Sequence, residues 1–532
     1  MVSGHGKDIL KGAAIISAFV LVGKAMGFVQ KLVMAHYFGT GVEADAYTLA
    51  FSSIVFAIGL FPQQLLSPFL PLFAEKRKKE GEAAAWRLAG SVGSLVVLAL
   101  VAVVVAGVTL APQLVGAASS FKSADTTRLA VKLVRIMMPA VYFMGLFAFL
   151  ALLLNAQKRF ARPALGDTVN KLVLIGGLIL LYRFFGISGL AVGVVLGAAA
   201  GYVIAATGVK DRLRGLSFGV DWKEPALKQL GVLMLPILLS VVIAQVRTII
   251  DYKFASGMAE GSTASINYAR SLVDTLVLLV PTAVGVAIYP VFSDMAAGKD
   301  RVALSDMLMR SLRMMVFLFI PVSVALILLR TPIVQIAFQR GQFTHESVAL
   351  TVAPLTYYSL GLTAFALEIL LMRFYFSMKN TLTPAIVGGL CVLVHLGVIL
   401  MFKDSLQNAS MALAATVSKG VKVAVLFVLL GSFLPTLQWR KNGVFVLKTL
   451  MAAACMGVAL VLVFKGAAAV LPDPDAVGKL ARLLVLALET GAAGVVGLAV
   501  FAAVARMLRM EESSAIGAWV KKRVGARVSG GG

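Results

Sequence analysis

Apolar runs long enough to cross a membrane recur from one end of this sequence to the other. Hydrophobic residues make up 60% of the chain, charged residues 14%, and the mean hydropathy is +0.93. The hydrocarbon core of a bilayer takes about 20 apolar residues per helical span, and backbone groups in lipid must be paired within the segment. The sequence therefore predicts an all-α polytopic membrane protein and argues against a soluble protein of several globular domains.

Polar residues, glycines and prolines divide these runs into about fourteen predicted helices. Their expected bounds are residues 9–37, 44–74, 86–111, 127–156, 163–183, 186–208, 229–254, 264–291, 306–329, 349–377, 382–402, 408–433, 444–465 and 478–508. Short cytoplasmic loops carry an excess of Lys and Arg, and basic clusters such as 76–79 and 210–214 alternate with loops that hold few cations. This alternation predicts both termini in the cytoplasm and a basic amphipathic helix over residues 511–528 on the inner face.

Basic residues give the chain a formal net charge of +24. They are spread over the loops between apolar runs and do not form one block. That distribution is typical of topology signals and of contact with anionic lipid, and it argues against a nucleic-acid partner.

The first half of the sequence is repeated. Three pairs of segments align in register: Phe38–Phe51 with Phe254–Ala269, Phe61–Glu75 with Val280–Asp294, and Met138–Phe149 with Ala353–Phe365. Six spans per copy is an even number, so both copies keep the same orientation, as in a parallel repeat about an axis along the membrane normal. The predicted division is an N-terminal lobe (1–222), a C-terminal lobe (223–436), two extra helices (437–510) and a basic tail (511–532).

The sequence contains no motif for nucleotide hydrolysis, zinc binding, nucleophilic catalysis or dithiol redox chemistry. Its two cysteines, Cys391 and Cys455, lie in apolar runs, and its four histidines show no ligand spacing. We therefore predict that the protein is not an enzyme and has no cofactor, catalytic residue or metal site. Without an ATP site, transport would be driven by the membrane potential or by a Na⁺ or H⁺ gradient.

Charged residues inside the predicted spans indicate function, because a charge at mid-bilayer costs a few kcal/mol and usually faces a cavity or a partner. Lys24 lies near the middle of the first span, and Lys31 follows seven residues later on the same face. In the eighth span Arg270 and Asp274 are spaced i, i+4. Cations outnumber anions in this set, which predicts a cationic cavity for an anionic guest such as phosphate.

Interhelical ion pairs and side chains that reach an interface are the alternative for these residues. That alternative is favoured for Lys31 and stays open for Arg270 with Asp274. His395, in the eleventh span, is either an ion-coupling group or a hydrogen-bonded histidine of the bundle.

Two stretches carry a resemblance to a known family. They are GKAMGFVQKLVMAHYFGTGVEADAYTLAF (Gly23–Phe51) and FQRGQFTHESVALTVAPLTYYSLGLTAFALEILLMRFYFSMKNTLTP (Phe338–Pro384). The chain resembles the MurJ/MviN family of lipid II flippases, within the multidrug/oligosaccharidyl-lipid/polysaccharide exporter superfamily, over about residues 10–430. The resemblance implies two six-helix lobes, a lateral gate for a lipid tail, and alternating access that turns a lipid-linked disaccharide-pentapeptide outward.

The resemblance also assigns roles to particular positions, and this sequence departs from several of them. Lys24, Gln30 and Ile58 stand where the family carries cavity arginines, whereas one arginine of helix eight survives as Arg270. Lys keeps the positive charge of Arg but cannot make the bidentate hydrogen bonds that a guanidinium makes to a diphosphate. Together with the charges inside the spans, the resemblance gives a predicted substrate-binding set of Lys24, Arg270, Gln30 and Lys31. Asp45, Asp274 and Glu368 are predicted to act in gating or support, and Asp251 and His395 are candidates for ion coupling.

These expectations define one main hypothesis and its alternatives. The main hypothesis is a flippase for lipid II in the bacterial inner membrane, with membrane lipids and the cell-wall synthesis machinery as further partners. A flippase for another polyprenyl-linked polysaccharide of the O-antigen or capsule type is the first alternative. A cation-coupled drug antiporter of the same superfamily is the second, and it predicts an acidic cavity. A membrane-embedded glycosyltransferase, the weakest, would require clustered carboxylates on an outer loop.

Overall fold

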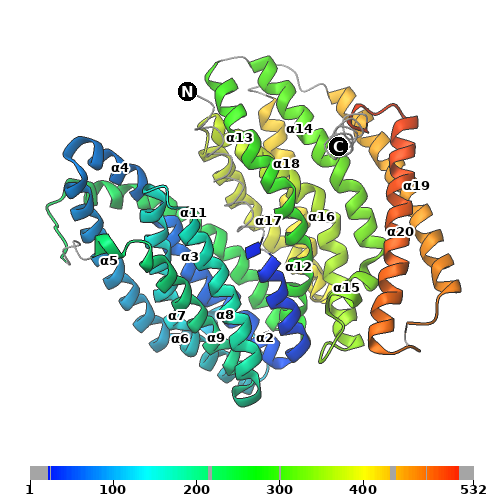
Figure 1. Cartoon of the computed structure of the whole chain (residues 1–532). Helices are drawn as coiled ribbons and strands as arrows, with labels where there is room; N and C mark the ends of the chain where they lie inside the picture. The colour runs from blue at the N-terminus through cyan, green and yellow to red at the C-terminus, as the bar shows by residue number, and fades with distance from the viewer. Residues whose placement is uncertain are drawn as a thin grey trace, which may run out of the picture. The chain divides into compact units, whose positions relative to one another are not determined.

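Helices make up nearly all of the computed structural model, which describes residues 22–23, 25–213, 219–298, 301–431, 439–474 and 476–513 (Figure 1). No strand occurs in these ranges. The predicted all-α class is therefore confirmed. The chain divides into two compact units, one of Met1–Asn267 with Arg340–Ser347 and one of Tyr268–Gln339 with Val348–Gly532. The four-part division expected from the sequence stays a prediction.

The first unit begins with a helix over residues 25–38. It continues with α2 (Val42–Thr48), η1 (Leu49–Val55), α3 (Phe56–Leu65), α4 (Phe69–Glu80), α5 (Glu82–Thr109), α6 (Ala111–Ala118), α7 (Ala124–Ala156), α8 (Ala161–Phe185), α9 (Ile187–Thr207), α10 (Lys210–Leu213) and α11 (Pro225–Ser256). The stretch from α2 to α4 corresponds to the predicted span 44–74. It contains a π-helical segment at η1 and a proline inside α3, both of which interrupt the regular α-helical hydrogen bonding.

An aromatic core holds the first unit together at the ends of α4, α5 and α7. The rings of Phe69 and Phe149 pack with centroids 5.6 Å apart, and Phe73 meets Trp86 edge to face at 5.7 Å. Aliphatic side chains of the same helices surround these rings. Aromatic pairs of this geometry stabilise a core beyond the area they bury.

The second unit contains most of α12 (Ser262–Leu279) and the helices that follow it. These are α13 (Pro281–Ala297), α14 (Arg301–Leu328), α15 (Arg330–Phe338), α16 (His345–Ser377), α17 (Leu382–Leu406), α18 (Ala409–Leu430), α19 (Trp439–Val470) and α20 (Lys479–Met507). The last two form a hairpin beside α14 (Figure 1). Phe317 of α14 packs against Phe501 of α20 at 5.0 Å between centroids, so the hairpin is anchored to this unit by its core.

Eleven helices in the described ranges are long and apolar enough to cross a membrane. They correspond to eleven of the fourteen predicted spans. Of the other three, residues 9–37 lie partly outside the described residues, 229–254 falls within α11, and 264–291 is divided between α12 and α13 at Pro281. The count of fourteen stays a prediction, and the expected basic helix over 511–528 lies outside the described residues beyond Ser513.

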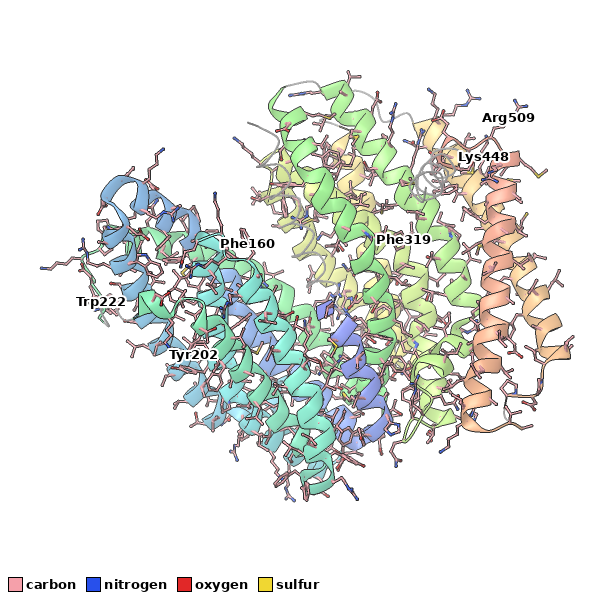
Figure 2. The ribbon with its side chains drawn as sticks, viewed as in Figure 1. Phe160, Tyr202, Trp222, Phe319, Lys448 and Arg509 are labelled. Carbon is pink, nitrogen blue, oxygen red and sulfur yellow. The ribbon has the colours of Figure 1, made fainter. Side chains whose placement is uncertain are left out.

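Large apolar side chains cover the outward faces of many of these helices. Phe184 and Leu180 of α8, Leu462 of α19 and Leu480 of α20 are all exposed. Figure 2 shows the side chains of both units and labels Trp222, which is exposed in the loop before α11. A soluble monomer rarely carries so much exposed apolar surface, whereas lipid covers it in a membrane protein. The protein is a multi-pass membrane protein.

Three turns of the first unit meet to form what we call the turn cluster, comprising residues 36–45, 257–264 and 340–347. The backbone N–H of Gln342 donates to the carbonyl of His36 at 2.9 Å. Gly39 has φ +54°, and a Cβ on it would lie 2.3 Å from the Gln342 carbonyl oxygen. Gly261 has φ +86°, and a Cβ on it would lie 2.5 Å from the carbonyl oxygen of Thr40. Only glycine combines this backbone conformation with so close an approach.

We predict that Gly261→Ala destabilises the protein by more than left-handed strain alone, because the added methyl group meets the Thr40 carbonyl. Gly81 is a matched control, since it has φ +88° and nothing within 4 Å of its Cβ position. Gly81→Ala should cost about 1–3 kcal/mol, because the backbone conformation at Gly81 (φ +88°, ψ 174°) is essentially restricted to glycine. Thermal unfolding of the purified protein in detergent measures both, and equal losses would contradict close packing of the turn cluster.

Candidate functional site

Asp45 is a buried carboxylate at the centre of the turn cluster. Its two oxygens accept hydrogen bonds from the backbone N–H groups of Gly261 and Ala264, each at 2.7 Å. These N–H groups begin α12, where a helix leaves its donors unpaired and presents the positive end of its dipole. A carboxylate in this position satisfies the donors and the dipole together. Asp45, predicted to act in gating or support, thus ties the first hairpin to the start of α12.

Lys31 belongs to a polar network on the first helix. Its ammonium donates to Oδ1 of Asn267, and Nδ2 of Asn267 donates to the Tyr252 hydroxyl at 2.8 Å and to Ser52 Oγ at 3.3 Å. The neighbouring Gln30 is partly buried, and its side chain lies beside the Tyr47 hydroxyl. The network joins the first helix, η1, α11 and α12, and this supports the interface alternative for Lys31.

Lys24 lies outside the described residues, so the structure does not test its predicted place in a cavity. Its neighbour Gly23 is buried, and a Cβ on Gly23 would lie 2.8 Å from Oδ2 of Asp167 and 3.2 Å from Nζ of Lys171. Asp167 and Lys171 form an ion pair on α8 with their charged atoms 2.6 Å apart. The sequence analysis missed this pair, although its i, i+4 spacing inside the span 163–183 was the available signal.

Glu368 of α16 is the anion of a three-residue charge cluster in the second unit. It accepts from Nζ of Lys422 at 2.8 Å and from Nζ of Lys419, both on α18. All three side chains are largely buried, and the Lys419 ammonium lies 5.3 Å from the centroid of the Phe365 ring. The cluster fixes α16 to α18 by charge-assisted hydrogen bonds. The lysines are spaced i, i+3, which places both on one helix face, but the sequence alone did not identify their shared partner.

Arg270 and Asp274 form the ion pair expected from their spacing on α12, with Nε and Oδ2 3.4 Å apart. Both side chains are at least one-third exposed. On α13 and α16 of the same unit, the guanidinium of Arg373 lies 5.9 Å from the centroid of the Tyr289 ring.

The two candidates for ion coupling are both buried. Asp251 lies on α11 in the first unit and His395 on α17 in the second. Among the described residues, no group of three or more His, Cys, Asp or Glu side chains is placed to hold a metal ion. Their role in ion coupling stays a prediction.

Long apolar spans that carry buried charge pairs and end in closely packed turns define a polytopic membrane transport protein. Comparison with known proteins identifies the family. The family model "Lipid II flippase MurJ" matches residues 34–470. The chain is 30% identical over 448 residues to the probable lipid II flippase MurJ of Rhizobium meliloti (strain 1021), covering 81% of each protein. It is 26% identical over 464 residues to that of Bdellovibrio bacteriovorus, covering 85% of this chain and 88% of the relative.

Solved structures agree with this relationship at the level of the fold. A lipid II flippase MurJ in an inward closed conformation superposes with a TM-score of 0.77 at 23% identity, over 93% of this chain and 99% of that one. An inward-facing multidrug resistance MATE family transporter of the MOP superfamily gives 0.67 at 14% identity, over 76% of this chain and 93% of that one. The chain belongs to the MurJ family of lipid II flippases.

We predict that Glu368→Gln lowers the free energy of unfolding by about 3 kcal/mol, because it removes the carboxylate that two largely buried ammonium groups share. Lys422→Met should cost less, since it leaves Glu368 with Lys419. Glu75→Gln is the control, because the Glu75–Lys79 pair has the same kind of charges at 2.6 Å but is exposed and contributes little. Denaturant or thermal unfolding measures the loss in stability of each variant. Equal losses in Glu368→Gln and Glu75→Gln would contradict a stabilising role for the cluster.

Proposed function

We propose that this protein is a non-hydrolytic flippase that moves lipid II, the undecaprenyl-diphosphate-linked peptidoglycan precursor, from the inner to the outer leaflet. The observation that carries this proposal is the match of the lipid II flippase family over residues 34–470. Eleven apolar spans, with ion pairs inside α8 and between α16 and α18, support a transport role. A precursor carried on a diphosphate is an anion, and lysine or arginine side chains at a water-filled surface within the membrane can bind it by charge-assisted hydrogen bonds.

In the proposed mechanism, Lys24 and Arg270 attract the diphosphate, and Gln30 and Lys31 are further candidate contacts. The sugar-peptide head group enters a wet cavity while the lipid tail stays in the bilayer through a lateral opening. A lysine at the first position acts as a point charge, so orientation of the diphosphate would depend on other donors. Alternating access then exposes the bound head group to the outer side.

Asp45 is the proposed latch of the outer end. Its two 2.7 Å hydrogen bonds to the start of α12 hold the turn cluster together, and opening that end would require their release. Asp274 and Glu368 have supporting roles in this proposal, since they pair Arg270 and the two lysines of α18. A latch made from a few hydrogen bonds suits a conformational switch, because each charge-assisted bond is worth only about 1.5–3 kcal/mol.

The driving force is proposed to be the membrane potential or an ion gradient. Moving one charge through 100 mV supplies about 2.3 kcal/mol, which is enough to bias the direction of transport. Asp251 and His395, both buried, are the candidate groups for Na⁺ or H⁺ coupling. The proposed location is the bacterial cytoplasmic membrane with both termini inside, next to the cell-wall synthesis machinery.

One alternative substrate class follows from the departures at Gln30 and Ile58, which replace cavity arginines that the family resemblance implies. A different polyprenyl-linked glycan would then be the cargo. A cation-coupled drug antiporter is less well supported, because the similarity to MATE transporters, at 14% identity, shows the fold alone. The family match favours lipid II over both.

Lys24→Ala is expected to abolish lipid II translocation while leaving expression intact, because it removes the central cation of the first helix. Vesicles that contain the purified protein measure translocation of lipid II beside another polyprenyl-linked sugar. Lys79→Ala, at an exposed lysine of α4, is the control and should behave as wild type. Full rescue of a flippase-depleted strain by Lys24→Ala, or preference for the other sugar, would sink the assignment to lipid II.

Asp45→Asn is expected to shift the protein toward states open at the outer side, because a neutral amide holds the α12 N-terminus more weakly. A single cysteine at Ser347, in a variant in which Cys391 and Cys455 are serine, reports opening by its labelling rate with a membrane-impermeant maleimide. The rate should rise about tenfold. Glu260→Gln, which weakens an exposed 3.1 Å bond to the Val42 N–H, is the control and should change it little. An unchanged rate in Asp45→Asn would refute the latch.

A further inference from the structure

The ion pair of Asp167 and Lys171 lies deep in the membrane-spanning part of α8. Counting 1.5 Å per residue from Ala161, Asp167 is about 9 Å and Lys171 about 15 Å along a helix whose whole length is about 37 Å. Lys171 is therefore near the middle of the span. The side chain of Asp167 is 47% exposed and that of Lys171 is 24% exposed, so neither is enclosed by protein.

The exposed surface of this pair does not face lipid. The lipid-facing stripe of α8 is marked by Leu165, Leu172 and Ile179, which are exposed and recur every seven residues. At 3.6 residues per turn, Lys171 lies about 100° and Asp167 about 140° around the helix from Leu172. The pair therefore points away from the apolar stripe.

A second face of α8 is used for packing on α9. A Cβ on Gly197 of α9 would lie 2.6 Å from the carbonyl oxygen of Asn170, and one on Gly201 would lie 3.0 Å from that of Gly166. Figure 1 shows α8 and α9 side by side in the first unit. Neither Asp167 nor Lys171 belongs to this contact. The element that they approach is the first helix, at Gly23.

Stability does not account for a charged pair in this place. A partly exposed i, i+4 pair is worth about 0.3–0.5 kcal/mol, whereas a lysine or aspartate at mid-span costs a few kcal/mol to insert. Such residues are retained in spans where they face water and a polar guest. Gly23 leaves room for the pair, since a Cβ there would clash with the Asp167 carboxylate at 2.8 Å.

We propose that Lys171 is a substrate-contact residue that binds the diphosphate of the lipid-linked precursor, with Asp167 as its positioning residue. This inference rests on the proposed function and adds a lysine of α8 to the proposed cationic contacts of the first helix. In the unloaded protein Asp167 neutralises and orients the ammonium at 2.6 Å. The ammonium of a lysine has three N–H donors, and Asp167 accepts from one of them. An arriving diphosphate oxygen accepts a hydrogen bond from one of the other two. Lys171 thereby replaces part of the hydrogen bonding to the diphosphate that is lost because position 24 is a lysine and not an arginine.

The test measures binding of undecaprenyl diphosphate and of uncharged undecaprenol to the purified full-length protein. Lys171→Gln should weaken diphosphate binding about tenfold or more and leave undecaprenol binding within about twofold, because only the diphosphate uses the ammonium. It should also flatten the salt dependence of diphosphate binding. Lys171→Arg should keep the affinity within about threefold. Lys79→Gln, from an exposed i, i+4 pair on α4, is the matched control and should bind as wild type.

A charge-swapped double variant, Asp167→Lys with Lys171→Asp, separates ligand binding from a role in docking the first helix. The swap keeps an ion pair, so a purely structural pair would tolerate it, whereas we expect diphosphate binding to fall as in Lys171→Gln. Equal losses for both ligands in Lys171→Gln, unchanged diphosphate binding, or a swapped variant that binds as wild type would each overturn the proposal.

Lipid II translocation in vesicles by the same proteins separates this inference from the proposed function. If the wild type moves lipid II and Lys171→Gln moves it equally well with unchanged affinity, the inference fails and the flippase assignment stands. If the wild type neither binds undecaprenyl diphosphate nor moves lipid II, both fail.

Discussion

Every charge inside a lipid-spanning helix needs a partner or water, and this constraint explains where the polar groups of the protein lie. Glu368 meets two lysines, Asp45 meets the N–H groups of a helix start, and Asp167 meets Lys171. Each of these contacts joins or adjoins a second helix, so the charges also position the elements around them. The apolar side chains alone would not do this, because lipid tails solvate them as well as a neighbouring helix does.

The charged groups differ in how exposed they are to water. The Glu368 cluster is largely enclosed, and its removal is expected to cost stability. The Asp167–Lys171 pair is partly exposed although it lies within an apolar span. Exposure at that depth requires a wet surface, which is what a transporter of a polar head group needs.

The sequence was enough to predict the fold class and the bounds of most helices, because spanning length and loop charge are properties of single segments. It was not enough to predict the π-helical segment at Leu49–Val55. It placed residues 264–291 in one span, although proline favours the start of a helix, as it does at Pro281. The spacing of Lys419 and Lys422 places both on one helix face, but only the fold brings Glu368 to that face. Asp167 and Lys171 were not predicted as site residues, because their close approach to Gly23 of another helix is visible only in the fold.

The contact of Asp45 with Gly261 joins the two hairpins that the internal repeat pairs, Phe38–Phe51 and Phe254–Ala269. The contact is asymmetric, because the first hairpin supplies a carboxylate and the second supplies backbone N–H groups. The first hairpin accepts these hydrogen bonds and the second donates them. A single substitution in either hairpin therefore acts on one side of the contact, and the other side cannot compensate for it.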